Sequence, residues 1–168
     1  MRKSSAFLVL PLIALAAAGC GSSSKKKSTT SAPAVTKSTA TTSPSTGATK
    51  VSSTTIAGLG TVLVNAQGKT LYTFEPDKAK KVTCTGGCAA TFPPLILSGT
   101  KAVAAGAVKA SLLSADPNPS GGKVVTYAGW PLYTYVADSY PGLVAGQADS
   151  FGGGLWYVIS PSGAVIKK

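Results

Sequence analysis

The amino-acid sequence predicts an all-β domain, mainly antiparallel, built from two three-stranded repeats with at most one short helix. From about residue 55 onward, short aromatic and β-branched runs alternate with turn residues, which is the pattern of strands joined by hairpins. A block of ten residues then occurs twice, which indicates a repeated structural unit. We therefore expect one small β domain over residues 55–168, with repeats at about 59–97 and 123–160.

The first repeat contains two strand-like runs separated by a turn and followed by a third run. Thr61–Val64 is mostly apolar, Asn65–Gly68 is rich in turn residues, and Lys69–Glu75 is a run of polar, apolar and aromatic side chains. The aromatic segment Phe92–Leu97 supplies the third strand. Runs of this length between turn residues predict an antiparallel hairpin with one added strand.

The second repeat follows the same order. Val124–Tyr127, Trp130–Val136 and Leu155–Ser160 are β-branched or aromatic runs, and turn residues separate them. Between the repeats, the alanine- and leucine-containing segment Lys101–Ser114 is the only candidate for a short helix, although Gly106 lowers its helix propensity.

The two repeats share a motif that can be aligned without gaps. Residues 68–77 match residues 129–138 at five identical positions, among them a tyrosine and, five residues later, an aspartate. Because neither three-stranded unit can cover its own apolar face, we expect the two copies to pack against each other with pseudo-twofold symmetry.

The candidate motif residues are the repeated tyrosine and aspartate, Tyr72 with Asp77 and Tyr133 with Asp138. Alternation along a strand directs each tyrosine to one face, and each aspartate follows at a strand end. An aspartate there commonly accepts backbone N–H bonds and stabilises the turn, with a tyrosine hydroxyl as an extra donor. The alternative is that both pairs meet across the pseudo-twofold axis and bind a cation or another polar ligand.

The first twenty residues carry an export signal. Arg2 and Lys3 precede the apolar run Ala6–Ala18, and small residues then lead to Cys20. The run is shorter than the roughly 20 residues that a membrane-spanning helix needs, so the pattern predicts a cleaved signal peptide over residues 1–19. The final Ala-Ala-Gly-Cys resembles a lipobox, which predicts that lipid (palmitate) on Cys20 holds the chain at the extracytoplasmic face of the cell membrane.

Residues 20–54 are nearly all Ser, Thr, Ala, Lys, Gly and Pro, and they contain no aromatic residue. Such a segment cannot bury enough apolar surface to offset its ordering entropy, so we expect a disordered tether. Much of the formal charge of +11 belongs to the signal and the tether, and the nine lysines and five acids after residue 54 leave about +4. Because no arginine follows Arg2, the forked donors typical of nucleic-acid sites are missing, and we expect no nucleic-acid partner.

Cys84 and Cys88 remain once Cys20 carries lipid, and in an exported protein they are expected to form a disulfide. Their Cys-x3-Cys spacing differs from the Cys-x2-Cys of thiol oxidoreductases, and two thiolates without a histidine make a poor zinc site. We therefore expect the pair to have a structural role.

These motifs together resemble those of a known family. The Tyr-x4-Asp motif occurs twice, and residues 84–95 resemble a Cys-x3-Cys and aromatic-Pro-Pro block, with Phe92 where tryptophan is more usual. Over residues 59–158 the chain is similar to the bacterial lipoproteins known as the secreted repeat of unknown function. The resemblance implies an exported lipoprotein with this repeat architecture, and it implies no reaction mechanism.

The chain has no histidine, which excludes a Ser-His-Asp triad and a histidine-ligated metal site built from its own residues. We therefore expect a non-catalytic module, without cofactor or metal, that binds a ligand or partner at the cell surface or wall, or scaffolds the envelope. The alternative is a redox or electron-transfer accessory that holds a metal or cofactor with its aromatic and acidic side chains.

Overall fold

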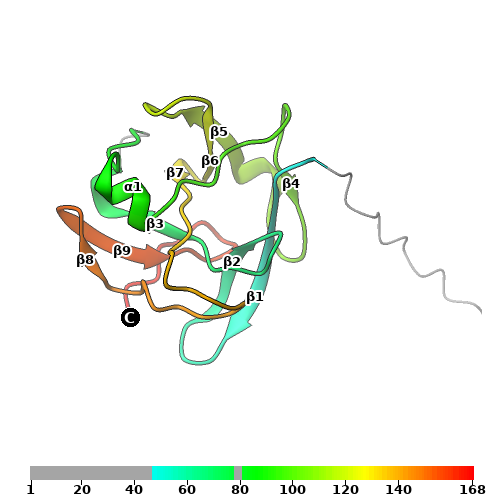
Figure 1. Cartoon of the computed structure of the whole chain (residues 1–168). Coiled ribbons are helices and arrows are strands. Elements are labelled where there is room, and N and C mark those ends of the chain that lie inside the picture. Colours follow the sequence, from blue (N-terminus) through cyan, green and yellow to red (C-terminus); the bar gives the residue numbers. More distant parts are fainter. Residues whose placement is uncertain (1–46, 78–80) are drawn as a thin grey trace, which may run out of the picture. The chain divides into compact units, whose positions relative to one another are not determined.

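Nine strands arranged in three small sheets dominate the computed structural model, which describes residues 47–77 and 81–168 (Figure 1). The strands are β1 Lys50–Ile56, β2 Gly60–Asn65, β3 Tyr72–Phe74, β4 Val103–Ala104, β5 Leu113–Pro117, β6 Lys123–Tyr127, β7 Trp130–Pro131, β8 Ser150–Phe151 and β9 Gly154–Val158. The sheet orders are β2-β1-β4, β3-β9-β8 and β5-β6-β7, and only the pairing of β1 with β4 is parallel. The predicted all-β, mainly antiparallel class is confirmed.

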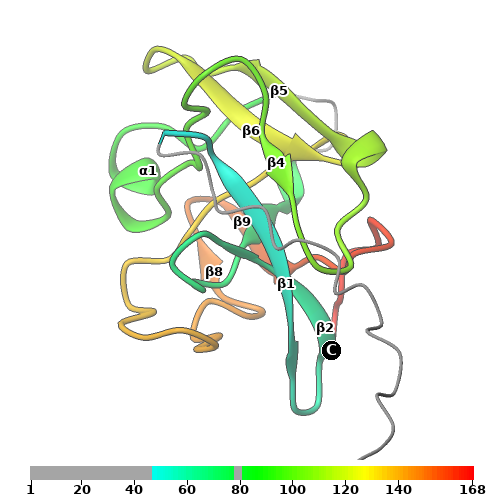
Figure 2. The same ribbon diagram turned by 90° about the vertical axis from the view of Figure 1, so that its right-hand side faces the viewer.

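Each repeat is preceded or opened by a two-stranded hairpin. In the first, β1 and β2 pair from Val51 opposite Asn65 to Ile56 opposite Gly60. In the second, β5 and β6 pair over five residue pairs. Figure 2 shows these two hairpins at opposite ends of the domain, with β4 beside β1.

The folded domain begins earlier than the composition predicts. A tether extending to residue 54 is expected from the sequence, but β1 starts at Lys50, and Val51 is fully buried. The Ser- and Thr-rich stretch after Val51 has little apolar surface of its own, and its pairing with β2 stabilises it instead. The predicted signal peptide over residues 1–19, Cys20 and the tether up to residue 46 lie outside the described residues.

The α-helix of the described residues, α1 (Gly87–Thr91), does not lie where the sequence predicts a helix. The segment Lys101–Ser114 instead contains β4, the 3-10 helix η2 (Ala110–Leu112) and the start of β5. The N–H of Val103 donates to the carbonyl of Thr49 at 2.8 Å, and Gly106 adopts the left-handed region with a φ of 63°. Pairing with β1 and a left-handed glycine prevent the helix, so that prediction is wrong.

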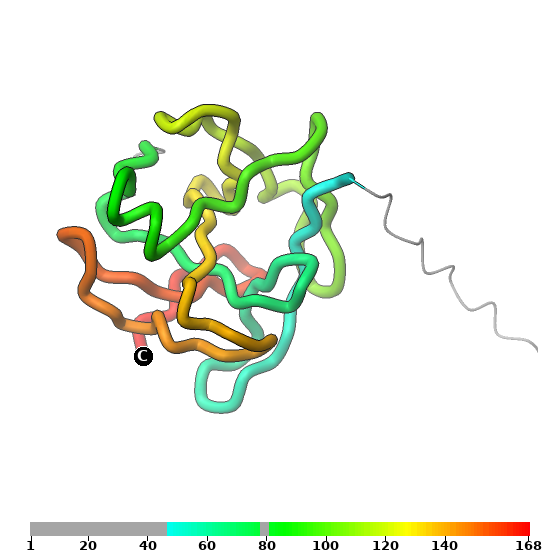
Figure 3. The backbone as a smooth tube through the Cα atoms, viewed as in Figure 1, coloured from blue at the N-terminus to red at the C-terminus, as the bar shows by residue number. Residues whose placement is uncertain are grey.

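The third segment of each repeat pairs with the other repeat. β3 of the first repeat pairs with β9 of the second, with Tyr72 opposite Val158. Symmetrically, Tyr133 of the second repeat forms a bridge with Pro94 of the first. Tyr72 and Tyr133 also exchange backbone hydrogen bonds of 2.8 and 3.0 Å, which places the pseudo-twofold axis between them. In Figure 3 the exchange can be followed by colour, with orange β9 beside green-blue β3.

Two buried clusters lie on opposite faces of these central segments. One contains Leu71 and Leu132, and the other contains Tyr72, Tyr133 and Trp156. Neighbouring residues alternate between faces, so the leucine and the tyrosine of each motif enter different clusters, as the strand pattern predicts. The tyrosine hydroxyls are thereby carried into the interior.

Candidate functional site

Each motif tyrosine donates a hydrogen bond to the aspartate of the other motif. The hydroxyl of Tyr72 donates to Oδ2 of Asp138 at 2.7 Å, and the hydroxyl of Tyr133 donates to Oδ2 of Asp77. All four residues are fully buried. The structure therefore brings the four candidate residues together as two crossed pairs, and neither motif is self-contained.

The second oxygen of each aspartate holds the loop that follows it. The 3-10 helix η1 (Glu75–Asp77) turns the chain out of β3, and Oδ1 of Asp77 accepts bonds from the N–H and the hydroxyl of Thr83, at 2.8 and 2.6 Å. Oδ1 of Asp138 accepts a bond from the N–H of Ala145 at 3.0 Å. These contacts correspond to the turn-stabilising interpretation of the aspartates, with the tyrosine hydroxyl as the extra donor.

The electrostatics of the crossed pairs favour neutral phenols. Burial raises the pKa of Tyr72 and Tyr133 far above the ordinary value, and the hydrogen-bonded carboxylate adds to the rise in each. Burial also raises the pKa of Asp138, while the hydrogen bonds from Tyr72 and Ala145 oppose that rise. Both phenols therefore remain protonated donors at neutral pH, and neither is an activated nucleophile.

A continuous stack of aromatic rings lies beside the crossed pairs. Phe92 lies between Tyr135 and Trp156, with centroid distances of 4.4 and 3.8 Å, and Phe74 stacks on the other face of Trp156 at 4.4 Å. The edge of this arrangement is closed by Tyr133, which meets Trp156 at 5.1 Å in a T-shaped contact. Such contacts stabilise a small core beyond the area they bury.

The predicted disulfide between Cys84 and Cys88 is confirmed. It closes the loop that leads into α1, and Cys84 packs in the same buried cluster as Trp156. Within residues 47–77 and 81–168, no three His, Cys, Asp or Glu side chains gather into a group that could hold a metal ion. The same residues include no helix with the length and apolar character needed to cross a membrane.

Several partners of the motif could not be identified from the sequence. Thr83 and Ala145 follow their aspartates by six and seven residues, in loops that show no pattern. The sequence contains one indication of the crossed pairing, because a tyrosine and an aspartate five residues apart would face opposite sides of a continuous strand. That odd separation argues against a bond within one motif.

The fold and the crossed pairs define a small all-β repeat protein in which two half-domains exchange strands and hydrogen-bond partners. The family model described as "secreted repeat of unknown function" matches the chain twice, over residues 53–96 and 116–160. The chain belongs to this family, and the resemblance seen in its motifs is confirmed. The description of the family indicates a secreted protein. No curated protein and no solved structure matches the chain.

Proposed function

We propose that this secreted repeat protein is a lipoprotein, held at the extracytoplasmic face of the cell membrane by palmitate on Cys20. Its β domain is a non-catalytic module that binds a ligand or partner of the cell envelope, or scaffolds the envelope. The apolar run Ala6–Ala18 followed by small residues and Cys20 supports the anchor.

The observation that carries the non-catalytic role is the burial and saturation of the motif. Both oxygens of Asp77 and both oxygens of Asp138 accept hydrogen bonds from the protein itself. A general acid or base must reach its substrate within hydrogen-bond distance, and these carboxylates are fully buried among their partners. The tyrosine and aspartate side chains of the repeated motif thus stabilise the fold, and we expect a ligand or partner to bind at the surface around them.

The anchor is tested by metabolic labelling of the full-length protein with a palmitate analogue. Wild type should be labelled, and Cys20→Ala should lose the label and be either soluble or retained by its uncleaved signal. A Cys84→Ser/Cys88→Ser variant is the matched control, because it removes the other two cysteines and should keep its label. Equal labelling of wild type and Cys20→Ala would refute the lipid anchor.

A redox or electron-transfer accessory is the second candidate, and the ring stack of Tyr135, Phe92 and Trp156 favours it. The two candidates differ in their response to metal ions. A ligand present at 100 times its dissociation constant adds about 2.7 kcal/mol to stability, so thermal melts with and without Ca²⁺, Cu²⁺ or Fe³⁺ distinguish them. We expect the melts to coincide. A metal-dependent rise that disappears in Asp77→Asn and Asp138→Asn would favour the second candidate.

A further inference from the structure

A pocket of about 400 Å³ opens on the surface between the segment after Leu97 and the β5–β6 hairpin. This volume lies within the range of about 300–1,000 Å³ that is usual for small-molecule sites. Leu97, Ala102 and Leu113 contribute apolar surface to it. Its polar lining is two lysines and two hydroxyl side chains: Lys101, Lys123, Thr100 and Ser114.

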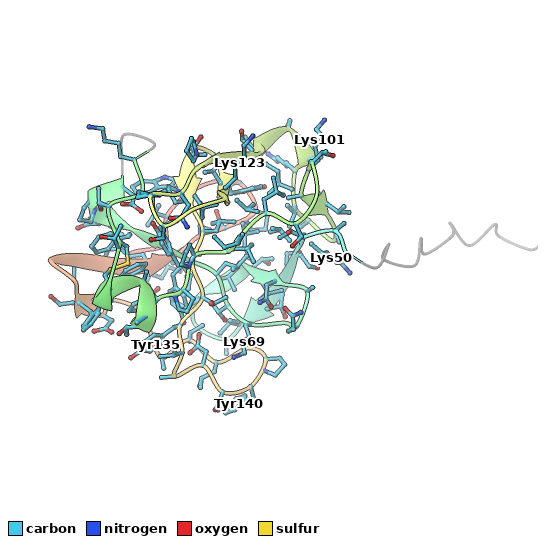
Figure 4. The ribbon with its side chains drawn as sticks, turned by 45° about the horizontal axis from the view of Figure 1, so that its top comes forward. Lys50, Lys69, Lys101, Lys123, Tyr135 and Tyr140 are labelled. Carbon is cyan, nitrogen blue, oxygen red and sulfur yellow. A yellow bond between two sulfur atoms is a disulfide. The ribbon has the colours of Figure 1, made fainter. Side chains whose placement is uncertain are left out.

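Local folding explains why the two lysines line the same pocket. Lys123 is the first residue of β6, and its carbonyl accepts a bond of 2.8 Å from the N–H of Leu97. That bond brings the segment carrying Thr100 and Lys101 against the hairpin. Figure 4 shows Lys101 and Lys123 at the same end of the molecule, away from Tyr135 and Tyr140. All four polar side chains of the lining belong to exposed residues.

Neither lysine of this pocket forms an ion pair within 4.0 Å with any residue that the structure describes. Among the described residues, the ion pair within 4.0 Å is Lys167 with Glu75, on another part of the surface. Asp77 and Asp138 are buried in the crossed pairs and do not reach the surface. Asp116, two residues after Ser114 on β5, does not line this pocket, and it lines a neighbouring hollow that shares Ser114 with it. The burial of two carboxylates therefore leaves a more cationic surface than the composition suggests.

The pocket lies close to Thr49, which comes just before β1. The carbonyl of Thr49 accepts a bond from the N–H of Val103, and its hydroxyl oxygen accepts a bond of 2.6 Å from the N–H of Ser98. Thr49 thus holds both ends of the segment that carries Lys101. Lys50, one residue later, lines the adjoining hollow with Ser98. The cationic pocket therefore lies close to Thr49 and Lys50.

We propose that this pocket binds a phosphate group carried by an anionic component of the envelope, of the glycerol phosphate class. Ammonium groups are compact charges with three donors each and are common phosphate ligands. Two of them, with two hydroxyl donors, match the several oxygens of a phosphoester better than the two oxygens of a carboxylate. The apolar lining accommodates the carbon skeleton of the ester. The inference rests on the proposed envelope location, and it names the partner chemistry of that module.

The test is calorimetric titration of the soluble chain Gly21–Lys168, which includes every described residue, with sn-glycerol 3-phosphate. The pocket variant is Lys101→Glu/Lys123→Glu. The control variant, Lys81→Glu/Lys168→Glu, changes the net charge equally at exposed residues outside the pocket. Wild type and control should bind with affinities within threefold of each other, and the pocket variant should bind at least tenfold more weakly. Thermal melts establish that each variant is folded, and acetate and glycerol serve as comparison ligands.

A second arm distinguishes the sources of the phosphate. The same three proteins are sedimented with phosphatidylcholine vesicles that contain or lack phosphatidylglycerol. Pocket-dependent binding to the anionic vesicles assigns a lipid headgroup, and pocket-dependent binding to glycerol phosphate alone assigns a soluble or polymeric phosphoester. Equal affinities of the two double variants, equal binding of acetate, or no binding in either arm would overturn the proposal. Palmitate labelling of the full-length pocket variant keeps the two proposals separate, because loss of phosphate binding with an intact label refutes the pocket alone.

Discussion

Breaking the hydrogen bond between Tyr133 and Asp77 should destabilise the domain, and the two substitutions should be strongly coupled. Tyr133→Phe removes the hydroxyl and leaves Asp77 with the two donors of Thr83. A hydrogen bond to a charged group contributes about 1.5–3 kcal/mol, and both partners are fully buried. We therefore expect a loss in this range, measured as the free energy of unfolding in urea with an unchanged m value.

Asp77→Asn should cost a similar amount, because one carboxylate oxygen becomes an amide nitrogen that cannot accept a bond. Once either partner has been changed, the hydrogen bond between them is already lost, so the second substitution costs less free energy of unfolding. The double variant should therefore fall short of the sum of the single losses by a coupling free energy within the range of about 0.5–3 kcal/mol usual for contacting residues.

The control cycle uses the same residue types within one motif. Tyr72→Phe with Asp77→Asn removes no bond between the two residues, because Tyr72 donates to Asp138. These losses should add within about 0.5 kcal/mol, as they do for residues that share no partner. Coupling within the motif, together with additivity between Tyr133 and Asp77, would refute the crossed arrangement.

Three further predictions concern other parts of the same framework. The pKa of Asp138 is raised in the folded state, so the domain should lose stability as the pH rises from the ordinary aspartate range through that raised pKa. Thermal melts over this pH range measure the loss, and Asp138→Asn should lack this component of the pH dependence. Gly154→Ala places a Cβ about 2.5 Å from a ring carbon of Pro76, and the melting temperature should fall sharply, whereas Gly153→Ala meets no atom within 4 Å and should show only the cost of its positive φ. A fragment of residues 47–100 lacks β9, so its circular dichroism should be that of an unfolded chain until residues 101–168 are added.

The strands could be predicted because their signals are local. The runs around Val62 and Val125 lie between turn residues and form β2 and β6 as expected. Their main hairpin partners, however, are β1 and β5, which the sequence does not predict as strands. The sequence does not predict β1 as a strand, and the reason is physical. Its side chains are mostly Ser and Thr, and Val51 alone among its first three residues is fully buried, so the pairing with β2 and β4 decides the structure.

The sequence predicts which residues form the motif site, but it does not predict how they are hydrogen-bonded to one another. Repetition of the motif selects Tyr72, Asp77, Tyr133 and Asp138 without any structural information. Which tyrosine bonds to which aspartate depends on how the two halves meet, and no local pattern encodes that. The cationic pocket could not be predicted from the sequence for the same reason. Lys101 and Lys123 line it together because the backbone N–H of Leu97 donates to the carbonyl of Lys123 in the hairpin.

The crossed pairs explain why a small domain keeps two buried carboxylates when apolar side chains can be equally stabilising. Tyr72 and Tyr133 lie opposite each other on the axis, and this register alone supplies both aspartates with phenol donors. A slip of one residue would turn both tyrosines into the leucine cluster. It would also leave two buried carboxylates short of a donor, and an unpaired buried charge is far more costly than a poorly packed methyl group. The Tyr-x4-Asp motif thus fixes the register in which the two repeats pair. It also makes the folding of each half depend on the presence of the other.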